Sequence, residues 1–182
     1  DFELNGYTVK WEILNSSSFG IPQLRERAII VGVRNDLDCH EAFQFPAPTH
    51  GDGLKKVVSL NKVLTDNDTV GEKYYFSKRA VEGVKKAKGN MKRAVAQDVN
   101  GPCLTITSHL AKVSLNSRDP VLLVDSAKER YRRFSPAEAA GIQSFPEAFQ
   151  FKGSQGDAYR QIGNAIPPVL MWHIMQEINK LS

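Results

Sequence analysis

The sequence predicts an α+β fold in which two strands open the chain, an irregular β-rich stretch fills the middle and helices close it. Residues 8–15 (TVKWEILN) alternate imperfectly between apolar and polar side chains, and residues 27–33 (RAIIVGV) form a β-branched run. We therefore expect two neighbouring strands, the second well buried. Near the C-terminus, Leu170, Ile174, Ile178 and Leu181 recur at helical spacing, which predicts a terminal helix.

The middle of the chain begins after FPAP at residues 45–48, where the prolines indicate a boundary. Ser77 is expected to cap a helix that runs through Lys88 and ends at Gly89 and Asn90. Residues 104–107 and 121–124 are expected to form short strands.

The clearest local signal is SPAE at residues 135–138. Ser135 suits the N-cap, Pro136 the first helical position, and Glu138 closes a capping box. This helix should run to Gln143. A short helix is expected over residues 157–162, and the proline pair at 167–168 should open the terminal helix.

Composition excludes several classes of protein. Apolar residues make up 41% of the 182 residues, enough for a core and too many for wholesale disorder. The longest apolar runs, at 28–33 and 121–124, are too short to span a bilayer, and no secretory signal opens the chain. Cys39 and Cys103 form no disulfide framework or metal pattern with the histidines, so a reducing, cytoplasmic setting is expected. Because the chain begins at Asp1, its natural N-terminus is expected to lie elsewhere.

Positive charge is concentrated in the middle of the chain. Residues 55–93 hold 11 Lys and Arg against 4 Asp and Glu, although the whole chain carries a net charge of only +4. A polyanionic partner would account for this stretch, and a solvated lysine-rich helix would account for it equally well. Its densest part contains Lys85, Lys86, Lys88, Lys92 and Arg93.

The segment GIPQLRER (residues 20–27) leads directly into the second expected strand. In an extended chain Gln23, Arg25 and Arg27 project from one side and offer one amide and two guanidinium groups. Such groups suit phosphate oxygens and the carbonyl edge of a pyrimidine. The segment resembles motif VIII of DNA cytosine-5 methyltransferases; taken alone, two arginines on an exposed loop would be the favoured interpretation.

Two later segments resemble the same family in the same order. RRFSPAEAAGIQSFP (residues 132–146) is similar to motif IX, a capped helix that braces the target-recognition region. It departs from many members at Gly141, where they carry Arg, and at Ser144, where they carry Gly. YRQIGNAIPP (residues 159–168) closely resembles motif X, which implies that Asn164 and Ala165 lie near S-adenosyl-L-methionine. A Gly-Asn turn before a proline-capped helix can present N–H groups and an amide to a carboxylate. Taken alone, Gly-Asn before Pro-Pro is more often only a turn.

The stretch between motifs VIII and IX is unmatched, as expected for the family's variable target-recognition region. Within it, Thr105 and Ile106 resemble the Thr-aliphatic pair that ends the variable loops, which implies contact with DNA. The same two residues also simply suit a strand.

The family's cysteine nucleophile, in a Pro-Cys-Gln segment upstream of motif VIII, is not found. Pro102-Cys103 is followed by Leu104 and falls inside the recognition interval, with no evident basic partner to lower the pKa of its thiol. We interpret Cys103 as a small buried apolar residue. The chain could be a fragment, one subunit of a two-polypeptide enzyme or a remnant.

The resemblance implies three segments: residues 1–45 end a Rossmann-like catalytic domain, 46–153 form the target-recognition domain, and 154–182 return to the catalytic domain. It further implies the DNA-recognition half of a bacterial, restriction-modification cytosine-5 methyltransferase that needs its N-terminal half, covalent or separate, to act on double-stranded DNA. Gln23, Arg25 and Arg27 would position the target cytosine and phosphate, and the basic stretch would contact DNA. A stand-alone DNA-binding module is the alternative, but it has no reason to keep Asn164 and Ala165.

Overall fold

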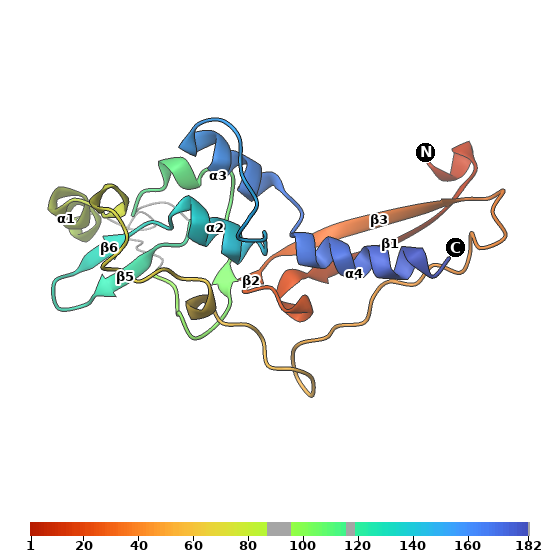
Figure 1. Ribbon diagram of the computed structural model, residues 1–182, viewed down its shortest axis with the longest axis horizontal. Helices are drawn as coiled ribbons and strands as arrows, with labels where there is room; N and C mark the ends of the chain where they lie inside the picture. The colour runs from red at the N-terminus through yellow and green to blue at the C-terminus, as the bar shows by residue number, and fades with distance from the viewer. Residues whose placement is uncertain (87–95, 116–118, 182) are drawn as a thin grey trace.

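The computed structural model describes residues 1–86, 96–115 and 119–181. Its path is elongated, with both chain ends at the end of the molecule that holds β1, β3 and α4 (Figure 1). The strands are β1 (Tyr7–Asn15), β2 (Gln23–Leu24), β3 (Glu26–Arg34), β4 (Cys103–Leu104), β5 (Leu122–Asp125) and β6 (Arg130–Arg132). The α-helices are α1 (Lys78–Lys86), α2 (Pro136–Ile142), α3 (Gln155–Asn164) and α4 (Pro168–Asn179). Short 3-10 helices are η1 (Glu3–Asn5), η2 (Ser16–Phe19), η3 (Leu60–Lys62), η4 (Glu72–Tyr74) and η6 (Leu110–Lys112).

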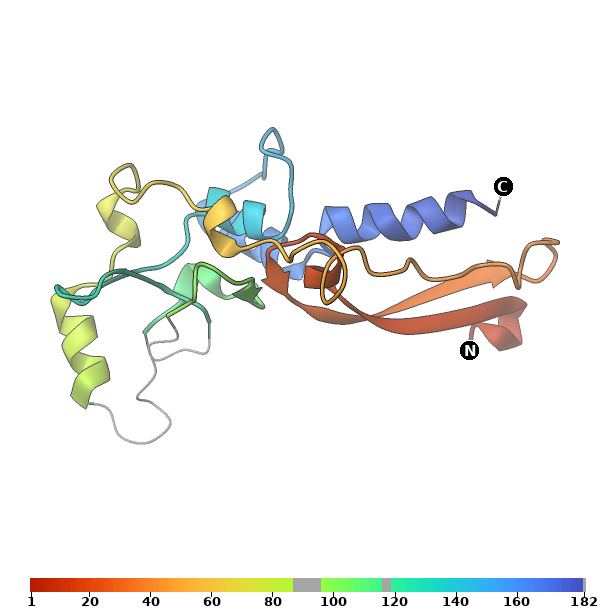
Figure 2. The ribbon, with the colours of Figure 1, turned by 90° about the horizontal axis from the view of Figure 1, so that it is seen from below.

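The two strands expected near the N-terminus are present and pair with each other. β1 and β3 form an antiparallel ladder from Tyr7 opposite Arg34 to Asn15 opposite Glu26. Helix α4 runs alongside one face of this ladder (Figure 2). The buried members of the resulting hydrophobic cluster are Leu14, Phe19, Ile21, Ile29, Leu170 and Ile174.

The prediction that the second strand is well buried is wrong. Only Ile29 of β3 is buried, and its neighbour Ile30 is 59% exposed. Successive side chains of a strand point to opposite faces, and within the described residues α4 covers one face only. Trp11, which faces Ile30 across the ladder, is accordingly 68% exposed.

The middle of the chain builds a second, larger hydrophobic cluster. The hairpin β5–β6 packs with α2, α3 and η6 around buried side chains that include Ile106, Phe134, Ile142 and Ile162. Between residues 46 and 153, the described strands are only β4, β5 and β6, so this unit is not β-rich.

The strand expected over residues 104–107 is shortened for a clear reason. It pairs in parallel with β2 only at Cys103 and Leu104. At Ile106 the backbone N–H donates to the Gln23 side chain and the backbone carbonyl accepts from Arg25. The two side chains therefore occupy the backbone N–H and carbonyl through which a longer strand would pair with its neighbour. The strand expected at 121–124 is β5, shifted by one residue.

The helix predictions are largely confirmed. The capping box at α2 is complete, with Ser135 accepting from the Glu138 N–H and Glu138 accepting from the Ser135 N–H. α3 is longer than expected and has a capping box of its own at Ser154. Ser77 accepts from the Ala80 N–H at the start of α1, while the expected helix end at residues 89–90 lies outside the described residues.

Helices α3 and α4 pack in different hydrophobic clusters. The division at residue 154 falls before α3, yet Tyr159 and Ile162 of α3 belong to the larger cluster. Leu170 and Ile174 of α4 belong to the smaller one. The chain therefore crosses between the two units at residues 165–167. In the described part of the chain, no helix is long and apolar enough to cross a membrane.

Candidate functional site

The three motif VIII side chains do not share one environment. Gln23 is 0% exposed and Arg25 is 3% exposed, while Arg27 lies open to solvent and donates to the neighbouring Glu26 carbonyl at 2.6 Å. The expectation that all three face a ligand therefore needs correction. Gln23 and Arg25 lie in the junction between the two clusters, where other elements cover them, and only Arg27 is accessible.

Arg25 binds backbone carbonyls from two distant parts of the chain. Its Nη1 donates to the Ile106 carbonyl at 3.1 Å, and its Nη2 donates to the carbonyls of Gly163 at 3.0 Å and Ala165 at 3.2 Å. Burial, and secondarily the charge of Arg27, lower the pKa of Arg25 to about 10. The guanidinium therefore stays charged at neutral pH.

Gln23 and Gln143 complete this arrangement. The Gln23 amide donates to the Gln143 side-chain oxygen, while its own oxygen accepts from the Ile106 N–H at 3.0 Å. Gln143, at the end of α2, donates to the carbonyls of Ile162 at 2.8 Å and Ala165 at 3.0 Å. We call Gln23, Arg25 and Gln143 the junction cluster. Gln143 was predicted only as a helix end; nothing in its local sequence indicates this role.

The motif X turn leaves α3 directly beside the junction cluster. A Cβ atom at Gly163 would lie 2.3 Å from the Ser108 nitrogen and the Thr107 carbonyl carbon, so only glycine allows α3 this close to residues 107–108. The next residue, Asn164, is exposed, and Ala165 is half-buried. Among the described residues, none forms a hydrogen bond with the Asn164 side-chain amide, which is thus available to a ligand.

The two residues expected at the end of the variable loops behave differently. Ile106 is 0% exposed and packs in the larger cluster, so its side chain cannot touch DNA in this arrangement. Thr105 is half-buried and donates to the Leu24 carbonyl at 2.7 Å. The pair thus ties the middle unit to β2, and only Thr105 has a partly accessible side chain.

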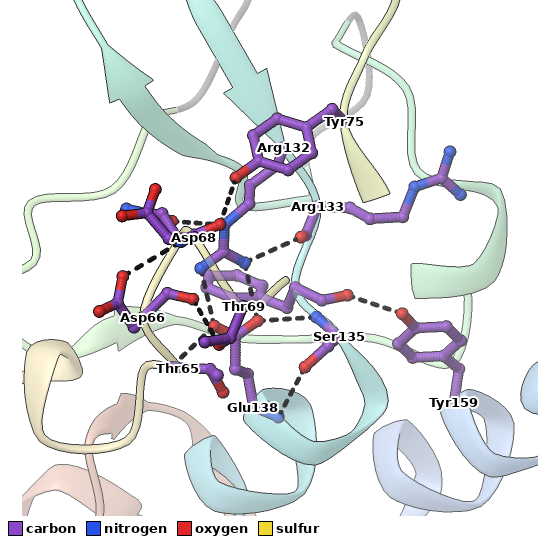
Figure 3. A network of polar contacts seen from close by, with 12 residues as sticks. Thr65, Asp66, Asp68, Thr69, Tyr75, Arg132, Arg133, Ser135, Glu138 and Tyr159 are labelled. Carbon is purple, nitrogen blue, oxygen red and sulfur yellow. Dashed lines mark hydrogen bonds and ion pairs between the residues drawn. The ribbon is translucent and has the colours of Figure 1, made fainter. Parts of the chain in front are cut away.

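A buried ion pair joins helix α2 to β6 within the middle unit (Figure 3). Arg132 and Glu138 form a bidentate pair at 2.7 and 2.8 Å, with side chains 1% and 0% exposed. Glu138 also accepts from the N–H groups of Thr65 at 3.0 Å and Ser135 at 2.8 Å. The Arg132 Nε donates to the Asn67 side chain at 2.8 Å. Motif IX therefore holds the loop at residues 65–67, consistent with a bracing role.

The two departures from the family pattern have local explanations. A Cβ atom at Gly141 would lie 3.1 Å from the Val63 Cβ, so a larger residue there would have to displace Val63. Ser144 has a φ of 65°, a left-handed conformation that costs a non-glycine residue about 1–2 kcal/mol. Its hydroxyl accepts from the Val169 N–H at 3.1 Å, in the first turn of α4, and this bond offsets part of that cost.

The expected basic contacts lie away from the junction. α1 stands at the opposite end of the molecule from α4 and the β1–β3 ladder (Figures 1 and 2). Lys86 is exposed on α1, and Lys85 is in the same helix. Lys88, Lys92 and Arg93 lie outside the described residues.

Cys103 is enclosed in the larger cluster and is 0% exposed. Burial raises the pKa of its thiol well above the ordinary value. A thiol so protonated and enclosed cannot attack a base, which agrees with the interpretation of Cys103 as an apolar residue. Among the described residues, no group of His, Cys, Asp and Glu could hold a metal ion.

The mixed α/β architecture, with the motif VIII strand and the motif X turn held in one junction, is consistent with a methyltransferase fold. The chain belongs to the C-5 cytosine-specific DNA methylase family, which it matches over residues 1–180.

Relatives of known sequence and structure agree. The chain is 32% identical to the type II methyltransferase M.BsuRI of Bacillus subtilis over 186 residues, covering 93% of this chain and 42% of that protein. It is 33% identical to M.NgoFVII of Neisseria gonorrhoeae over 187 residues, covering 92% and 49%. The fold resembles that of a DNMT2 mutant of Spodoptera frugiperda, with a TM-score of 0.70, 16% identity and coverage of 99% of this chain and 59% of that one. The chain thus spans about half the length of the curated relatives it matches.

Proposed function

We propose that this chain is the DNA-recognition part of an S-adenosyl-L-methionine-dependent DNA cytosine-5 methyltransferase of a restriction-modification system. Residues 1–45 and 165–182 would belong to its catalytic domain, and the residues between them would read DNA. The junction cluster carries the proposal, because it joins the motif VIII strand, the end of the variable region and the motif X turn through buried hydrogen bonds. A stand-alone DNA-binding module would have no need to hold an exposed Asn164 beside that strand.

The uncovered face of the β1–β3 ladder supports a missing N-terminal half. Val9, Trp11 and Ile13 of β1 share this face with Ile30 of β3, and Trp11, Ile13 and Ile30 are each more than half exposed. Apolar patches of this kind mark surfaces that another part of a protein covers. We infer that further strands and helices of a doubly wound catalytic domain pack here, and that they bring the cysteine nucleophile.

The residues of this chain would hold and orient the reactants. Arg27 is the accessible guanidinium of motif VIII and would hold the extruded cytosine through charge-assisted hydrogen bonds. Asn164 and Ala165 would line the cofactor side of the junction, where the unpartnered Asn164 amide fits a polar group of the cofactor. S-adenosyl-L-methionine, when bound, supplies the methyl group. The lysines of α1 and of the stretch that follows it would contact phosphates and position the duplex.

The first experiment compares this chain alone with the same chain joined to its N-terminal half. Each sample receives duplex DNA and methyl-labelled S-adenosyl-L-methionine. We expect label on DNA only from the joined protein, because the chain alone offers no accessible thiol at the junction. Transfer by the isolated chain that disappears in Cys103→Ser would contradict the proposal.

Single-residue changes then test the roles assigned to Arg27 at the cytosine and to Asn164 at the cofactor. In the joined protein, Arg27→Ala should lower the single-turnover methyl-transfer rate by more than about 10-fold, the scale of one lost charge-assisted hydrogen bond. Arg34→Ala, at the other end of β3, should leave that rate unchanged. Asn164→Ala should weaken S-adenosyl-L-methionine binding by about 1–3 kcal/mol in calorimetry while DNA affinity stays the same. An unchanged transfer rate in Arg27→Ala would reject the role of Arg27 at the cytosine.

A further inference from the structure

The junction cluster contains a buried arginine that has no carboxylate partner. Among the described residues, no Asp or Glu forms an ion pair with Arg25, whose Nη atoms donate only to backbone carbonyls. A buried charge left this way is costly unless hydrogen bonds replace its water. Neutral side chains could also satisfy single carbonyls, whereas the rigid guanidinium fork bonds three carbonyls from two segments at once.

Two of the three carbonyls that Arg25 bonds lie at the C-terminal end of α3. The last turn of a helix leaves carbonyls without intrahelical partners and carries partial negative charge, which a cation stabilises. Arg25 bonds the carbonyls of Gly163 and Ala165, and Gln143 bonds those of Ile162 and Ala165. These four bonds flank Asn164 on both sides. They therefore fix the backbone on either side of Asn164.

The same cluster also holds the other side of the junction. Gln23 accepts from the Ile106 N–H, and Arg25 donates to the Ile106 carbonyl. A planar guanidinium presents its donors in a rigid fork, so Arg25 cannot follow a displacement of Ile106 without changing its bonds to Gly163 and Ala165. Gly163 also lies so close to the backbone at residues 107–108 that the end of α3 and this backbone have little room to move relative to each other.

We propose that Gln23, Arg25 and Gln143 are positioning residues that couple the DNA side of the junction, at residues 105–107, to the cofactor side, at residues 163–165. The inference rests on the proposed function, which assigns these two sides. DNA bound on the first side shifts the α3 terminus toward the arrangement that binds cofactor, and cofactor does the same for DNA. Such coupling is reciprocal and typically amounts to about 5–150-fold in affinity.

The test measures coupling in the full-length enzyme. The affinity for S-adenosylhomocysteine, which cannot donate a methyl group, is determined by calorimetry with and without unmethylated linear plasmid DNA. We expect DNA to raise this affinity by about fivefold or more in the wild type. In Arg25→Met and in Gln143→Met the gain should fall to within about twofold of none, with both ligands still binding separately.

Arg133→Met is the matched control. Arg133, like Arg25, has a buried Nε without a partner and donates to a backbone carbonyl, that of Ala111 at 3.0 Å. It bonds neither side of the junction, so its loss should reduce stability without changing the coupling. If Arg25→Met fails to fold, Arg25→Lys keeps the charge but lacks the fork, and it should retain less than half of the wild-type gain.

The outcomes are distinct. A wild type that binds both ligands without mutual enhancement, or cluster variants that keep the full enhancement, would overturn the coupling and leave the proposed function intact. A wild type that binds neither ligand would overturn the proposed function and this inference with it. Equal loss of coupling in Arg133→Met would show that general destabilisation, and not the junction cluster, is responsible.

Discussion

Removing the buried carboxylate of Glu138 should destabilise the protein far more than breaking an exposed ion pair. Each Glu138 oxygen accepts two hydrogen bonds, from Arg132 and from the backbone N–H of Thr65 or Ser135. In Glu138→Ala the Arg132 guanidinium stays buried with its charge uncompensated, which costs about 3–5 kcal/mol. The two orphaned N–H groups add to this by about 1–3 kcal/mol each if water cannot reach them.

The chain offers a matched control for this change. Arg34 and Asp36 form a bidentate pair of the same chemistry, but their side chains are 62% and 60% exposed. Asp36→Ala should therefore cost less than about 1 kcal/mol. The double variant Arg132→Met with Glu138→Leu should recover the part of the loss that comes from the uncompensated charge, because an apolar pair can replace a buried ion pair at little cost.

Urea unfolding of the full-length protein, followed by far-ultraviolet circular dichroism, measures these differences. Tryptophan fluorescence is less suitable, since Trp11 and Trp172 both lie outside the middle unit. Hydrogen exchange should localise the effect to the amides of Thr65 and Ser135. If Glu138→Ala lowered the free energy of unfolding by less than about 1 kcal/mol, as Asp36→Ala should, burial would not make the Arg132–Glu138 pair indispensable, and the reasoning would be refuted.

Further predictions concern close packing, thiol reactivity and DNA contact. In thermal melts, Gly163→Ala should lower stability by at least about 3 kcal/mol, the upper range of overpacking. Gly83→Ala, whose added Cβ would meet no atom within 4 Å, should be neutral or stabilising. Iodoacetamide should label Cys39 in the folded protein and spare the buried Cys103, as mass spectrometry would reveal; rapid labelling of Cys103 would contradict its burial. Replacing the lysines at positions 85, 86 and 88 by Gln in the full-length enzyme should weaken target and non-target DNA alike and lower the salt slope by about one unit per lost contact. A changed target sequence with an intact slope would count against phosphate contact.

Much of the local structure could be predicted from the sequence because its causes are local. The capping box at Ser135, the proline start of α4 and the β-branched run of β3 depend on residues within a few positions of one another. The order of the three motifs likewise predicted the family to which the chain belongs. Both are properties that neighbouring residues specify without reference to the rest of the fold.

The tertiary structure decided which residues of those motifs are free to act. Alternation places Gln23, Arg25 and Arg27 on one side of an extended segment, but it does not say which of them another element will cover. Coverage comes from Ile106, Gln143 and the end of α3, more than 80 residues away in sequence. Burial of a polar side chain is settled by such distant partners, because a charged or amide group enters the interior only where carbonyls and N–H groups meet it. The sequence therefore determined the family and its local elements, and only the packing of distant segments separated the exposed Arg27 from the buried junction cluster.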